Sequence, residues 1–331
     1  MAHLFPLEMG PPIGAIVGNP LLIGLAGAHA HRDYIDPNLI YGIISHAPLL
    51  LPHLCSSYFA LPFRAGSLSN LSSLTLCRGQ NLHKVGAPLY NHHVLKIYAL
   101  SDLHLSFSND KAMDIFGEKW RVHWQKIAHN WNQIVEPEDI VLVAGDISWA
   151  MRPPEAEQDL RWLIGLKGRK VLIRGNHDYW WQSIGKLRNT YPELYFVQND
   201  SVYLDGVSIC GSRGWSLPGS PEYNSQDEKI FQRELARLEL GLKSLEPQAK
   251  LRIAMMHYPP HSISLQSSEF GQLLERYKVD ACVFGHIHNF TTPSLCYTKS
   301  GINYYLTSAD YLNFQPALIW NGQELTSTNK L

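Results

Sequence analysis

The sequence lacks several features that would assign it quickly to a class of proteins. Its 331 residues include only five cysteines, which are odd in number, scattered and without a CxxC pair. This argues against a disulfide framework or a cysteine zinc site and favours a reducing, cytoplasmic location. The formal net charge of −1 shows no basic excess, which argues against a nucleic-acid-binding protein. The composition is otherwise that of a soluble globular protein.

Charged residues are especially scarce in 1–93, an apolar extension rich in Gly, Pro and Ser without a sustained hydrophobic period. Its stretch GPPIGAIVGNPLLIGLAGA is nearly as long as a membrane span, but the prolines and glycines would interrupt a helix. The flanking MAHLFPLE lacks the basic region of a secretory signal. Three interpretations stay open: a disordered or non-native extension, a peripheral membrane or partner segment, and a small packed subdomain.

An organised domain is expected over 94–331, and a valine codon at Val94 could serve as a bacterial start. Apolar stretches alternate there with amphipathic ones, which predicts an α/β fold with sheets buried between helices. Strands are expected at 94–100, 139–147, 170–175, 201–211, 251–258, 281–286, 302–308 and 316–320. Helices are expected at 117–135, 153–166, 225–245 and 267–277. Tryptophans recur at helical spacing in the first helix, which predicts core packing.

Polar side chains follow five of these apolar strands, at the point where each strand ends. They are Asp102, His104, Asp146, Asn176, His177, Asp178, His257, His286 and His288. Each alone is typical of a turn or of a structural histidine. Together they would gather at one sheet edge, where ligands of α/β proteins bind. Clustered carboxylates and imidazoles are costly without compensating cations, so the pattern predicts two divalent metal ions.

The order of the motifs resembles that of the calcineurin-like metallophosphoesterase superfamily: D-x-H, G-D, G-N-H-D, a lone His and G-H-x-H. The resemblance covers about 94–321, and the segment from SDLHLSF to RGNHDYWW is similar to a bacterial branch of predicted phosphohydrolases. It implies a four-layer sandwich of two mixed β-sheets flanked by helices, with a di-metal site.

The resemblance also implies a ligand set for each metal. One metal would be held by Asp102, His104, Asp146 and His288, and the other by Asp146, Asn176, His257 and His286. Asp146 would bridge the two ions. Mixed nitrogen and oxygen donors favour Mn²⁺, Fe²⁺ or Zn²⁺ over Mg²⁺ or Ca²⁺, and ligand type does not choose among the first three. Mn²⁺ is our first expectation, with Fe²⁺, Zn²⁺ or Ni²⁺ as alternatives. The family often has a further Asp after the G-D motif, where this chain has Trp149 and Ala150.

The implied reaction is hydrolysis of a phosphomonoester or phosphodiester by a hydroxide that bridges the metals. His177 matches a position that is not a ligand in the family, so we expect it to act as the general acid. Asp178 would orient His177 or cap the following helix. Asn176 and Arg213 are the expected substrate contacts, with Arg174 as the alternative cation to Arg213.

The substrate class stays open among nucleotides, cyclic nucleotides, phosphoproteins and a lipid-linked pyrophosphate. A lipid substrate would give residues 1–93 a use at a membrane. A nuclease is disfavoured because no basic stripe is evident. The alternative from another class is a catalytically silent binding scaffold with the same fold. The expected partner is therefore a phosphorylated small molecule or macromolecule.

Overall fold

The computed structural model describes residues 93–109, 111, 113–289 and 296–328. The predicted extension over 1–93 lies outside the described residues except for His93, so the expectations about it stay predictions. Among the helices described, none is long and apolar enough to cross a membrane.

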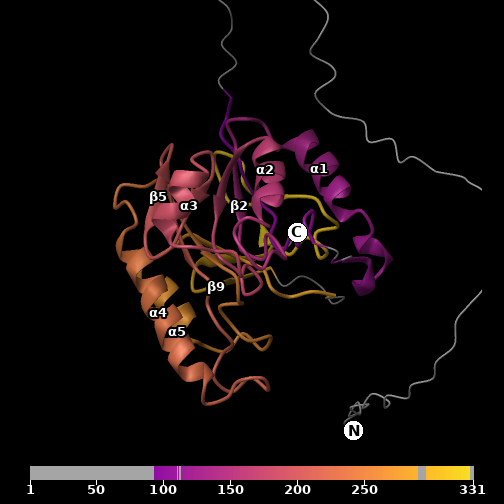
Figure 1. The fold of residues 1–331 in the computed structure, drawn as a ribbon. Coiled ribbons are helices and arrows are strands. Elements are labelled where there is room, and N and C mark those ends of the chain that lie inside the picture. Colours follow the sequence, from indigo (N-terminus) through magenta and orange to yellow (C-terminus); the bar gives the residue numbers. More distant parts are fainter. Residues whose placement is uncertain (1–92, 110, 112, 290–295, 329–331) are drawn as a thin grey trace, which may run out of the picture. The chain divides into compact units, whose positions relative to one another are not determined.

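Two mixed sheets form the domain (Figure 1). The first has the order β11-β1-β2-β3-β4, in which β11 is antiparallel to β1 and the other strands are parallel. Its strands are β1 (Ile97–Ala99), β2 (Ile140–Val143), β3 (Arg169–Leu172), β4 (Tyr195–Phe196) and β11 (Ala317–Trp320). The second has the order β5-β6-β7-β8-β10-β9, with antiparallel pairs only at its two edges. Its strands are β5 (Ser201–Leu204), β6 (Val207–Ser212), β7 (Leu251–Met256), β8 (Ala281–Phe284), β9 (Tyr297–Lys299) and β10 (Ile302–Leu306).

The helices cover the two outer faces of the sheets. They are α1 (His123–Ile134), α2 (Glu157–Gly165), α3 (Ile184–Thr190), α4 (Asp227–Lys243) and α5 (Glu269–Arg276), with short 3₁₀ turns η2 (Met113–Phe116) and η3 (Glu118–Trp120). Side chains of α1, α2 and α3 share a core with the first sheet, and those of α4 and α5 share one with the second. Figure 1 shows α4 and α5 together, away from α1 and α2.

A third core lies between the sheets, because side chains alternate along each buried strand. In β2, Ile140 and Leu142 belong to the core between the sheets, whereas Val141 and Val143 belong to the core under the helices. The layers are therefore helices, sheet, sheet and helices. The predicted four-layer sandwich of two mixed sheets is confirmed.

Two predicted elements differ from the structure. The stretch 201–211 is a hairpin of β5 and β6, not one strand, and its loop residues Asp205 and Gly206 have φ of 48° and 91°. Positive φ at both positions is the requirement of a tight hairpin turn. The helix predicted from 117 begins only at His123, because Val122 has a left-handed φ of 46°. Trp120 is nevertheless buried, as predicted.

Candidate metal centre

The polar strand ends converge as the parallel topology requires. β1, β2 and β3 of the first sheet and β7 and β8 of the second are each followed by one or more of the predicted ligands. Each sheet is parallel across these strands, so their carboxyl ends share one edge. Residues that are far apart in the sequence, such as Asp102 and His288, therefore lie close together at this edge.

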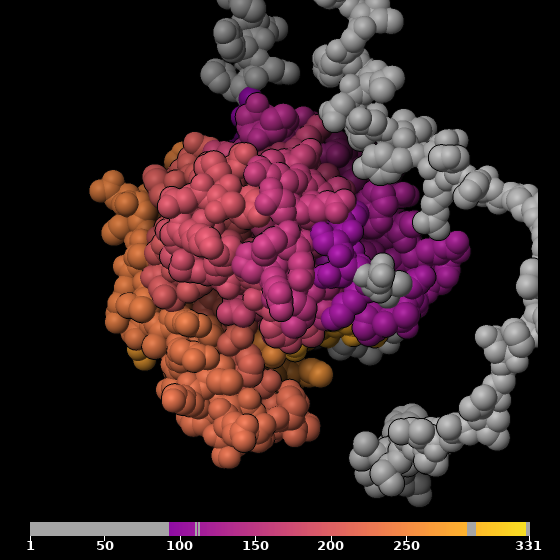
Figure 2. Space-filling view, in the orientation of Figure 1, coloured from indigo at the N-terminus to yellow at the C-terminus, as the bar shows by residue number. Residues whose placement is uncertain are grey.

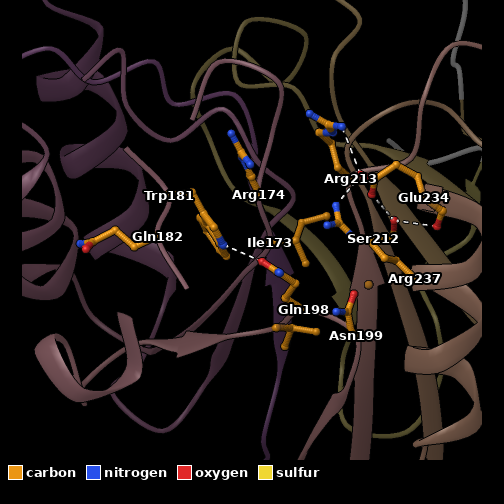
Figure 3. Close-up of a pocket in the computed structure, with 12 residues that line it drawn as sticks. Ile173, Arg174, Trp181, Gln182, Gln198, Asn199, Ser212, Arg213, Glu234 and Arg237 are labelled. Atoms are coloured by element: carbon orange, nitrogen blue, oxygen red, sulfur yellow. Dashed lines mark hydrogen bonds and ion pairs between the residues drawn. The ribbon is translucent and has the colours of Figure 1, made fainter. Parts of the chain in front are cut away.

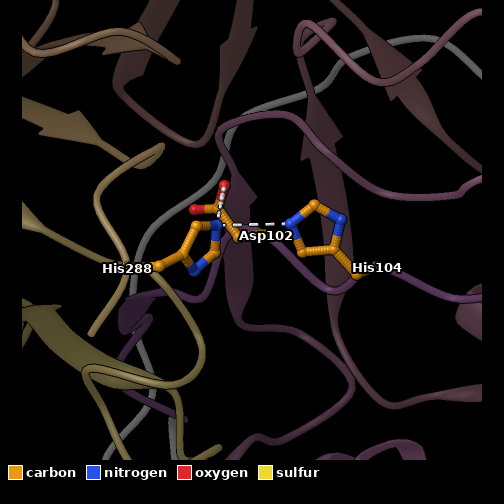
Figure 4. A group of neighbouring side chains, drawn as sticks. All are labelled: Asp102, His104 and His288. Atoms are coloured by element: carbon orange, nitrogen blue, oxygen red, sulfur yellow. Dashed lines mark hydrogen bonds and ion pairs between the residues drawn. The ribbon is translucent and has the colours of Figure 1, made fainter. Parts of the chain in front are cut away.

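One group of donors consists of Asp102, His104 and His288 (Figure 4), whose candidate ligand atoms lie within 4.8 Å of one another. Nε2 of His104 is 3.3 Å from Nε2 of His288, which is 3.7 Å from Oδ1 of Asp102. Two donors bound to one metal at about 2.1 Å each would be separated by similar distances.

A second group consists of Asn176, His257 and His286. Oδ1 of Asn176 is 2.6 Å from Nε2 of His257 and 3.0 Å from Nδ1 of His286. The two imidazole nitrogens are 3.3 Å apart. The amide oxygen and both rings therefore point to one place.

Asp146 lies between the two groups. Its Oδ2 is 3.8 Å from Nε2 of His104 and 3.5 Å from Nε2 of His257. Its Oδ1 accepts the backbone N–H of His177 at 2.8 Å. The structure thus brings the seven predicted ligands close together, with Asp146 between the two groups. The assignment of each residue to a metal stays a prediction.

The backbone around these donors is strained. Asp102, His104, Asp146 and His286 all have left-handed φ, between 46° and 72°. Such conformations cost about 1–3 kcal/mol each and concentrate at functional sites.

Glycine is required beside two of the carboxylates. A Cβ at Gly175 would overlap the Asp146 carboxylate, and a Cβ at Gly285 would overlap that of Asp102. Gly175 therefore serves close approach of the chain to Asp146; its φ is not in the positive region.

Electrostatics tests whether metal ions fit this site. Asp102 and Asp146 are buried, and burial raises the pKa of both carboxyls. Burial also lowers the pKa of His257 and His286 to about 3, so their rings are neutral with lone pairs available. Histidine binds a metal as the neutral imidazole, and aspartate binds it as the carboxylate. Metal cations would offset the free-energy cost of burying the two carboxylate charges. The donor set fits two divalent ions.

Further contacts fix the histidine rings. Nδ1 of His257 donates to the carbonyl of Ala144 at 2.9 Å, which leaves Nε2 for the site. Nδ1 of His288 is 2.9 Å from Oδ1 of Asp310, whose other oxygen, Oδ2, accepts from the ammonium of Lys119 at 2.9 Å. Such outer contacts orient metal-binding histidines. Asp310 was missed from the sequence because it follows β10 without a motif.

His177 borders the site without joining either donor group. Its ring is half-buried and lies 4.3 Å from the ring of Trp149, which stacks on His104 at 4.8 Å. Trp149, which replaces the acid often found in the family, thus packs against one predicted ligand and against His177.

Asp178 has a different place from the one predicted. Its fully buried carboxylate accepts N–H groups of Asp146, Ile147, Ser148, Gly175 and the Trp180 indole. It therefore holds the loop that carries Asp146, and no contact with the His177 ring exists among the described residues. It does not cap the next helix either, since α3 begins behind Ser183.

Arg213, the predicted substrate contact, makes an ion pair with buried Glu234 at 3.1 Å. Its guanidinium lies 4.4 Å above the Trp215 ring. Arg174 donates through Nε to the carbonyl of Asp178 at 3.1 Å. Whether either one contacts a substrate stays a prediction.

A cleft of about 960 Å³ opens beside the second donor group. Its lining includes His286, with Tyr258 packed on the imidazole at 4.0 Å and Trp215 at 5.2 Å from Tyr258. One wall is the segment before α4, which with α4 forms the orange lobe at the bottom of Figure 2. The cleft therefore gives a ligand access to His286, one donor of the second group.

Comparison with known families decides the identity. The family model described as calcineurin-like phosphoesterase matches residues 95–290. The chain belongs to the calcineurin-like phosphoesterase family. The matched range contains every donor of both groups, and the resemblance read from the motifs is confirmed.

Individual relatives of this chain are distant. An uncharacterized protein of Methanocaldococcus jannaschii is 26% identical over 199 residues, which are 56% of this chain and 94% of that protein. The gene 66 protein of Mycobacterium phage D29 is 35% identical over 83 residues, or 25% of this chain and 40% of that protein. Among solved structures, TT1561 of Thermus thermophilus has 13% identity and a TM-score of 0.40, covering 68% of this chain and 98% of its own. The 5'-nucleotidase of Candida albicans has 17% identity and a TM-score of 0.33, covering 64% and 45%.

Proposed function

We propose that this phosphoesterase hydrolyses a phosphomonoester or phosphodiester with two divalent metal ions. The observation that carries the proposal is the pair of donor groups joined at Asp146, with the unligated ring of His177 beside them. Bound there, two cations would lower the pKa of a shared water and polarise the phosphoryl oxygens. Mn²⁺ is the ion we favour, before Fe²⁺, Zn²⁺ and Ni²⁺.

The protein's own residues would then orient the substrate and move the proton. His177 donates a proton to the leaving oxygen, because its half-buried ring joins neither donor group while its backbone N–H is held by Asp146. Trp149 packs against that ring and limits its rotation. Asn176 supplies a neutral oxygen, which adds no negative charge to repel an anionic phosphate.

The cleft supports an organic, weakly charged leaving group. Its wall contains the aromatic rings of Trp215 and Tyr258, and its charged side chains are acidic, Glu222 and Glu269. Lys and Arg are absent from the residues that line it within the described part of the chain. Such a surface favours an apolar or aryl group over a nucleic-acid strand, whose binding depends on basic contacts.

A cytoplasmic location fits the described cysteines. Cys210 and Cys282 are buried free thiols, and burial raises the pKa of Cys210 to about 12. We therefore propose that the protein works in a reducing compartment, where such thiols persist.

Turnover by the full chain, loaded in turn with each of the four metals, tests the function. We expect metal-dependent hydrolysis of p-nitrophenyl phosphate or its bis ester, and a loss of at least about 100-fold in Asp146→Asn. Glu138→Gln, an exposed carboxylate just before β2 at the amino ends of the parallel strands, is the matched control and should keep wild-type rates. Absence of turnover with every metal would favour the binding scaffold instead.

A further inference from the structure

A small pocket at the same sheet edge is lined by three arginines (Figure 3). Arg174 follows β3, Arg213 follows β6, and Arg237 comes from α4. The pocket has a volume of about 80 Å³, well above the roughly 10–15 Å³ that a single water needs. Its lining also includes the amide side chains of Gln182, Gln198 and Asn199.

Positive charge exceeds negative charge in this pocket. Glu234 is the single carboxylate that lines it, and both Arg213 and Arg237 pair with Oε1 of Glu234, at 3.1 Å and 2.7 Å. One carboxylate therefore faces three guanidinium groups.

Part of the donor capacity of these arginines is unused. Nε of Arg213 is buried without a hydrogen-bond partner. Among the described residues, nothing accepts a hydrogen bond from the terminal nitrogens of Arg174, which bonds only through Nε. Burial lowers the pKa of Arg213. The positive charges of Arg174 and Arg237 lower it further, whereas the negative charge of Glu234 raises it. An oxyanion would supply both the missing acceptors and the missing negative charge.

The pocket lies next to the metal centre along the chain. Arg174 precedes Asn176 by two residues, and the carbonyl of Arg213 accepts the N–H groups of His257 and Tyr258 at 3.1 Å and 2.9 Å. The pocket is therefore linked, along the chain and through these backbone hydrogen bonds, to the segments that carry Asn176 and His257.

We propose that this arginine pocket binds a second phosphoryl group, distinct from the one that reacts at the metals. The choice of phosphoryl over other oxyanions rests on the proposed function, whereas the presence of an anion site does not. The group has two possible sources: a second phosphate on the substrate, or free inorganic phosphate.

Calorimetric titration of the full, metal-loaded chain with inorganic phosphate tests the site, repeated after chelation of the metals. We expect one saturable phosphate site per chain to persist after chelation, because the arginine pocket needs no metal. Arg237→Gln should weaken that site about tenfold by removing one charge-assisted hydrogen bond. Gln198→Glu should weaken it as well, because it adds negative charge while an oxygen acceptor for the Trp181 indole remains.

Arg233→Gln is the matched control, because Arg233 is exposed on the same helix and does not line the pocket. It should bind phosphate like the wild type. Loss of all saturable binding on chelation, or equal weakening by Arg233→Gln and Arg237→Gln, would overturn the proposal. Persistent binding in a chain that hydrolyses nothing would leave the pocket in place and refute the proposed function alone.

Kinetics with glucose 1,6-bisphosphate and glucose 1-phosphate separate the two sources. If the pocket takes a second phosphate of the substrate, Arg237→Gln should raise KM for the bisphosphate alone, with kcat unchanged. If it takes free phosphate, added phosphate should change the wild-type KM for both substrates, and this effect should shrink in Arg237→Gln. Either outcome supports phosphate binding in the arginine pocket and identifies the source of the bound phosphate.

Discussion

His177 differs from the other imidazoles at the metal centre because its ring joins neither donor group. We predict that His177→Gln lowers kcat by about 10²–10⁴-fold, the usual contribution of a general acid. The loss should be larger for an alkyl phosphate than for p-nitrophenyl phosphate, because p-nitrophenolate leaves without a proton. Metal analysis should still find about two ions per chain. An equal loss for both substrates would contradict the role of proton donor.

Asp310 acts on the metal centre through His288. Its carboxylate accepts from Nδ1 of that ring and is itself paired with Lys119. We predict that Asp310→Asn weakens the metal at the His288 group by about 10–100-fold, measured as metal retained in dialysis against buffered metal. Lys119→Met keeps the contact between Asp310 and His288 and should have a smaller effect. Unchanged metal retention in Asp310→Asn would show that the contact does not support binding.

The residues of the site were predictable to the extent that they follow apolar strands. His257 and His286 could be placed together from the sequence because parallel strands end at one edge. The position of Asp178 could not be predicted from the sequence. Its five N–H partners come from two loops, and the close approach of these loops depends on the glycines between them. The arginine pocket was also hidden, because Arg237 belongs to a helix far along the chain.

The turn after β3 packs closely against the loop after β2, and the point of closest approach is Gly175. We predict that Gly175→Ala destabilises the fold by about 1–3 kcal/mol and lowers metal content, because the added methyl displaces the Asp146 carboxylate. Gly185→Ala in α3 is the control: nothing lies within 4 Å of its Cβ, so it should stabilise by up to about 1 kcal/mol. Urea unfolding of both variants measures the difference. A Gly175→Ala protein with wild-type stability and metal content would contradict the close approach.

Among the elements, long periodic segments were predicted well and short or interrupted ones were not. α4 and α5 show a clear apolar face, so their existence followed from the pattern. The β5–β6 hairpin was taken for one strand because an apolar run continues across Asp205-Gly206, although that pair is a strong turn signal. The start of α1 was displaced by Val122, whose left-handed conformation has no sequence signal.

At the scale of the whole molecule, His261 links stability to pH. It is buried, and burial lowers its pKa to about 4, against about 6.5 in an unfolded chain. Between these values the unfolded state binds a proton that the folded state does not. Stability should therefore fall by up to about 3 kcal/mol as the pH drops from 6.5 to 4.

Urea unfolding of the wild type and His261→Gln at pH 7.5 and 5 measures this contribution. The variant should lose less stability between the two pH values, and the difference isolates His261 from the other histidines. The charges of Lys299 and Glu275 act on His261 in opposite directions, so neither should reverse the sign. Parallel losses in the two proteins would contradict the prediction.

Metal removal should destabilise the whole fold, because the donors come from both sheets. Ligands bound at 1,000 times their dissociation constant stabilise a protein by about 4 kcal/mol. We predict a lower Tm after chelation, measured by calorimetry, and recovery on adding the metal back. Asp146→Asn should show a much smaller shift. Identical Tm values with and without metal would indicate that the donor groups bind no ion.

The antiparallel pairing of β11 with β1 has a practical consequence. Ile97 lies opposite Trp320, so the chain enters and leaves the first sheet at neighbouring points. Both points are at the amino ends of the parallel strands, whereas the donors follow the carboxyl ends. An affinity tag or surface tether attached beside either strand would therefore hold the protein at the end opposite the donors. On a sensor or bead, the donor end would stay open to bulky substrates.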